Sequence, residues 1–180
     1  MSELQQALET LRDDLRASGA LDVSFLHEGF AGSIEDAFGE DEELAGLVLE
    51  EEPDLPADLR SFCHAVLFAD CARRLLDDIA TDGLPSIFYN WTTDEIAVLL
   101  GEFRRATDPA SPLLDRAHAV AAAKLELDGE SNWITRNEDD DPLDALGDDG
   151  MAELEKIESQ MEDDREPLYE RAVAALRAAV

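Results

Sequence analysis

Residues 57–80 read ADLRSFCHAVLFADCARRLLDDIA, and apolar side chains recur along them at helical spacing. The apolar face is broader than the stripe of an ordinary surface helix, so this stretch is expected to form the central buried helix. Asp82 and Gly83 follow it and are typical of a helix end. The core positions expected on this helix are Leu59, Phe62, Cys63, Val66, Leu67, Leu75, Leu76 and Ile79.

Amphipathic segments on both sides predict further helices. Residues 3–18 place Leu4, Leu8, Leu11 and Leu15 on one face, with Ser2 as the N-cap and Gly19 as the end. Thr93 is expected to cap a helix over 93–105, and Pro112 at the first position starts another over 111–126. The last helix covers 151–179, and Pro167 predicts a kink or break near Glu166.

The remaining segments are expected to be irregular. Residues 25–32 suggest a packed loop or short turns, followed by short helices at 33–38 and 42–51. Residues 84–91 are short, aromatic and bounded by turns, and we expect a packed loop there because a lone strand has no partner. Residues 128–150 are expected to be a mobile acidic connection. The predicted fold class is all-α, one domain over 1–180, built as a multi-helix bundle.

Charge is the most unusual property of the chain. It has 44 acidic and 14 basic residues, so its formal charge is 14 − 44 = −30, and its pI is about 4.1. Residues 1–60 hold 17 acids and 3 bases, residues 61–127 hold 10 and 6, and residues 128–180 hold 17 and 5. The two ends of the chain therefore carry most of the charge. A protein with this charge should repel nucleic acid and anionic membrane surfaces, so neither is expected as a direct partner.

No motif indicates catalysis, a metal or a cofactor. His27, His64 and His118 lack metal-ligand spacing, and the Asp-rich run lacks the calcium-loop frame because Leu143 takes its fifth place. Cys63 and Cys71 are about 12 Å apart on one helix, too far for a disulfide. No signal peptide or membrane span is visible. We therefore expect a cytoplasmic protein that is not an enzyme and needs no cofactor.

Carboxylates are the expected binding groups. Glu158, Glu162, Glu166 and Glu170 recur every four residues, which would align them in one row about 6 Å apart wherever the helix continues. Such a row resembles the phosphates of a duplex and suits a protein built to neutralise phosphates. The residues expected to bind the partner are these four, with Asp139, Asp140, Asp141, Asp144, Asp148 and Asp149 in the connection, and a second cluster at 40–43 and 50–52 that includes Glu42 and Glu43.

Two segments resemble a known family. Residues 82–90, DGLPSIFYN, and the last helix are similar to the aromatic loop and the acidic C-terminal helix of an acidic, all-helical bacterial family that includes a neisserial DNA-mimic protein. Gly83, Phe88 and Asn90 fit that loop, whereas Leu84, Pro85 and Ile87 depart from it. The resemblance spans about residues 60–180. It implies a helical homodimer whose acidic surface occupies the DNA-binding face of a basic protein.

Within that resemblance, the loop residues Gly83, Phe88, Tyr89 and Asn90 would be structural. Phe88 would be buried, and Asn90 would cap the next helix or bind loop amides. The expected partner is a basic DNA-binding protein, namely a transcription factor, a nucleoid protein or a nuclease. An immunity or anti-restriction protein that blocks a nuclease is an alternative within the same class.

Two alternatives come from other classes. The acidity could be solvent adaptation in a salt-loving organism, which the ratio of 2 Lys to 12 Arg also fits. Such adaptation should spread acidic residues evenly along the chain, whereas residues 61–127 carry a net charge of only −4. The other alternative is a small enzyme whose site is assembled from distant residues, which would place a perturbed titratable group in a closed pocket.

Overall fold

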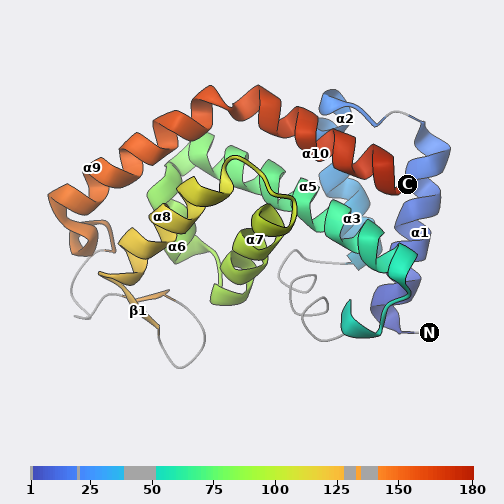
Figure 1. Ribbon diagram of the computed structural model, residues 1–180, viewed down its shortest axis with the longest axis horizontal. Helices are drawn as coiled ribbons and strands as arrows, with labels where there is room; N and C mark the ends of the chain where they lie inside the picture. Colours follow the sequence, from blue (N-terminus) through green and yellow to red (C-terminus); the bar gives the residue numbers. More distant parts are fainter. Residues whose placement is uncertain (1, 20, 39–51, 128–132, 135–141) are drawn as a thin grey trace. The chain divides into compact units, whose positions relative to one another are not determined.

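The computed structural model describes residues 2–19, 21–38, 52–127, 133–134 and 142–180. Helices dominate this part of the chain, and the predicted all-α fold class is confirmed (Figure 1). The chain groups into two compact units, one of Met1–Arg73 with Glu166–Val180 and one of Arg74–Arg165. The expected single-domain organisation stays a prediction. In the part described, no helix is long and apolar enough to cross a membrane.

Helix α1 (Glu3–Ser18) has the boundaries that the sequence predicts. The Ser2 hydroxyl accepts a hydrogen bond from the Gln5 amide at 3.2 Å, and Gly19 ends the helix in the left-handed conformation at φ 62°. All four leucines of the predicted stripe are buried. The helix packs its stripe against α3 (Phe30–Phe38) in the same unit.

The loop expected over residues 25–32 is mostly helical, so that prediction is wrong. Helix α2 (Val23–Glu28) begins where the Asp22 carboxylate accepts a hydrogen bond from the Phe25 amide at 2.8 Å, and α3 follows after Gly29. The cap compensates for the short length of α2, and Leu26 is buried. The helix expected at 42–51 lies outside the described residues.

Helix α5 (Ala57–Asp82) confirms the predicted central helix, and it follows a short 3₁₀ turn, η1 (Glu52–Asp54). All eight core positions expected on it are buried. It ends at Asp82 as predicted, because the Gly83 amide donates back to the Asp78 carbonyl at 3.2 Å with φ 81° at Gly83. The last turns of α5 lie in the second unit.

Helix α7 (Thr93–Arg105) is capped by Thr92, one residue before the predicted Thr93. Thr92 and Glu95 form a reciprocal capping box, in which the Glu95 carboxylate accepts from the Thr92 amide at 2.8 Å. Helix α8 (Ser111–Ala122) ends before the predicted Glu126. Residues 126–127 instead form strand β1, paired antiparallel with β2 (Trp133–Ile134).

The acidic connection expected over 128–150 is shorter than predicted, because helix α9 (Pro142–Asp163) begins within it. Pro142 suits a helix start, and Gly147 interrupts α9 at φ 67° and ψ 168°. The predicted break near Glu166 is confirmed, since α9 ends at Asp163 and α10 (Arg165–Ala179) begins after Asp164. Pro167 lies in the first turn of α10, where a missing amide hydrogen costs nothing.

Candidate partner-binding surface

The segment that carries the family resemblance is a helix and not a loop. Helix α6 spans Leu84–Asn90, so the loop prediction is wrong. Pro85 occupies its first turn, where proline is tolerated, and the five residues Leu84–Phe88 are buried. The helix lies against α9 and α8 in the same unit. The aromatic pattern of this segment reflects a buried short helix.

Helix α6 begins on the carboxylate of Glu158, which belongs to α9. Glu158 Oε2 accepts a hydrogen bond from the Leu84 amide at 2.7 Å. A negative charge at this position also suits the positive end of the helix dipole. Gly83 makes the approach possible, because its φ is 81° and a Cβ there would lie 3.1 Å from the same oxygen. Gly83 therefore positions the start of α6, and the role that the family resemblance gives it stays a prediction.

Phe88 is buried as predicted, with 3% of its surface exposed, and its ring lies 6.5 Å from the His118 ring. Tyr89 is half-buried, and Asn90 is exposed. Asn90 does not cap the next helix, because Thr92 has that role. The prediction that Asn90 caps the next helix is therefore wrong, and the alternative that it binds loop amides stays a prediction.

The four-residue row of glutamates is not continuous. Glu158 is half-buried and holds the start of α6, whereas Glu162, Glu166 and Glu170 are exposed. The break at Asp164 places Glu162 on α9 and the last two on α10, which belong to different units. The helix therefore does not continue through all four positions, and the four glutamates do not form one row on a single helix.

The other predicted binding residues fall into two groups. Asp144, Asp148 and Asp149 are exposed within α9. Asp139, Asp140 and Asp141 lie outside the described part of the chain, as do residues 40–43, which include Glu42 and Glu43, and 50–51. Glu52, the last residue of the second cluster, lies in η1 and pairs with Arg60 at 3.1 Å.

Helix α9 instead presents an acidic face at a seven-residue period. Asp148, Glu155 and Glu162 are all exposed and all follow the break at Gly147. Seven residues are about two turns, so these carboxylates recur about every 10.5 Å along the outer side of the helix. We call these three residues the α9 acidic face. The buried positions of the same helix are Leu146, Gly150, Leu154, Ile157 and Met161.

This face was missed because the sequence argument followed the four-residue spacing through Glu158. The signal that could have found it is the apolar pattern itself. Leu146, Leu154, Ile157 and Met161 define the buried side of α9, and the acids opposite them define the outer side. Helix α8 lies beside α9 (Figure 1). An ion pair between Arg116 and Glu153 joins the two helices.

His118 is a titratable group whose pKa departs from its ordinary value. Burial lowers the pKa of His118 below 6.5, and the positive charge of Arg104 lowers it further, while Asp115 opposes both effects. Arg104 and Asp115 form an ion pair beside this histidine at 2.6 Å. No group of three His, Cys, Asp or Glu side chains that could hold a metal occurs among the residues that the structure describes. Cys63 and Cys71 are buried free thiols.

Comparison of the chain with known protein families, with curated proteins and with solved structures finds no match in any of the three.

Proposed function

We propose that this protein is an acidic interaction protein of the DNA-mimic type, which binds the basic DNA-binding surface of another protein in competition with DNA. The partner would be a transcription factor, a nucleoid protein or a nuclease, in the cytoplasm. The family resemblance adds that the protein acts as a homodimer. The observation that carries the proposal is the α9 acidic face, a regularly spaced set of exposed carboxylates on a helix anchored by a buried apolar side.

The support is geometric as well as electrostatic. A carboxylate about every 10.5 Å on a rigid helix offers several charges at fixed positions, as a nucleic-acid backbone does. None of Asp148, Glu155 and Glu162 forms an ion pair with a described base. They are therefore available to the Lys and Arg side chains of a partner. Asp144 and Asp149 are exposed acids of the same helix that extend the candidate surface.

The test compares two triple charge reversals. One variant reverses the α9 acidic face, with Asp148→Lys, Glu155→Lys and Glu162→Lys. The control reverses three exposed acids of the other unit, with Asp14→Lys, Glu35→Lys and Asp36→Lys. Both variants have a formal charge of −30 + 6 = −24. Glu158 is left intact because its reversal would disturb α6.

Each variant is immobilised and exposed to host lysate at about physiological ionic strength, and bound proteins are released by duplex DNA. We expect the wild type and the control to retain a basic protein that DNA displaces. The α9 variant should lose that protein, because fewer phosphate-like charges remain. Equal retention by the α9 variant, or retention that DNA does not reverse, would contradict the proposal. Identification of the retained protein distinguishes a regulator from a nuclease.

A further inference from the structure

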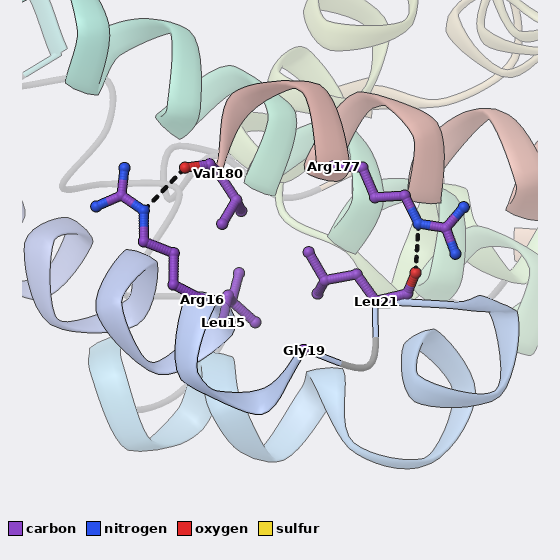
Figure 2. Close-up of a pocket in the computed structure, with 6 residues that line it drawn as sticks. All are labelled: Leu15, Arg16, Gly19, Leu21, Arg177 and Val180. Atoms are coloured by element: carbon purple, nitrogen blue, oxygen red, sulfur yellow. Dashed lines mark hydrogen bonds between the residues drawn. The ribbon is translucent and has the colours of Figure 1, made fainter.

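We draw no further inference here: the strongest candidate, the pocket between the ends of α1 and α10 in the first unit (Figure 2), carries no ligand proposal because Arg16 and Arg177 already donate through Nε to backbone carbonyls and the terminal nitrogens of Arg177 point away from the aliphatic lining.

Discussion

Gly83 shows how one residue can decide whether a helix forms where it does. Its φ of 81° is a left-handed conformation that favours glycine, and the Glu158 carboxylate occupies the space that a side chain would need. The amide of the next residue reaches Glu158 only because the backbone turns at this point.

We therefore expect Gly83→Ala to lower the free energy of unfolding by about 1–3 kcal/mol. Gly101→Ala in α7 is the matched control, since nothing lies within 4 Å of its Cβ position and its backbone is helical. That variant should gain about 0.5–1 kcal/mol of stability. Urea denaturation of the two variants measures the difference. If both substitutions changed the free energy of unfolding by a similar amount, the left-handed conformation at Gly83 would not be required for stability.

His118 provides a test of pH dependence. Burial and the charge of Arg104 lower its pKa below 6.5 in the folded state, so protonation favours the unfolded state. The unfolded state then binds more protons in the window just below that value, and the free energy of unfolding decreases as pH falls through it.

Substitution His118→Gln should remove this contribution and make the fall in stability between about pH 7 and pH 5 shallower. Chemical denaturation at the two pH values measures the slope, and an NMR titration of the His118 ring measures its pKa directly. A ring pKa above 6.5, or a steeper fall in the variant, would contradict the cause given for the shift.

At the scale of the elements, the sequence predicted those helices whose signals are local. Helix α1 was predicted with both ends because its cap, stripe and terminal glycine lie within one segment, and the break after Asp163 was predicted from Pro167 alone. The start of α6 was not predictable in this way, because its cap is a carboxylate 74 residues away. Because Glu158 is half-buried and already binds the Leu84 amide, it is not part of the candidate partner-binding surface.

The contact between α6 and α9 can be tested with two isosteric changes. Glu158→Gln keeps the shape of the side chain but removes the charge from the start of α6, so we expect a loss of about 1 kcal/mol. Glu162→Gln, one turn further on and exposed, should change stability by less than about 0.5 kcal/mol. Thermal denaturation of both variants under the same conditions measures the contrast. Equal melting temperatures of the Glu158→Gln and Glu162→Gln variants would contradict a capping role for Glu158.

At the scale of the whole molecule, the carboxylates divide into those used internally and those presented to solvent. Several acids already have partners within the chain, and Asp78, Glu95 and Asp115 are examples that bind Trp91, Arg74 and Arg104. The charge that a partner can use is therefore smaller than the formal charge of −30. The sequence alone could not separate these classes, because composition counts all carboxylates equally.

The response to salt distinguishes the interaction proposal from solvent adaptation. We expect the protein to be folded at about 0.15 M salt, with a melting temperature that rises as salt screens repulsion between the carboxylates. The hydrophobic stabilisation of the buried core does not depend on charge screening, so the core should hold the fold without molar salt. Circular dichroism over a salt series measures this. Folding only at molar salt would favour a halophilic origin of the charge.

The hydrogen bond from Leu84 to Glu158 also provides a way to observe the second unit opening. Amides in the first turn of a helix have no partner within the helix and normally exchange quickly with deuterated solvent. The Leu84 amide has a partner on α9, so its hydrogen should exchange slowly while α9 remains docked on α6. Its exchange rate therefore measures the free energy of separating these two helices, and it does so without any substitution.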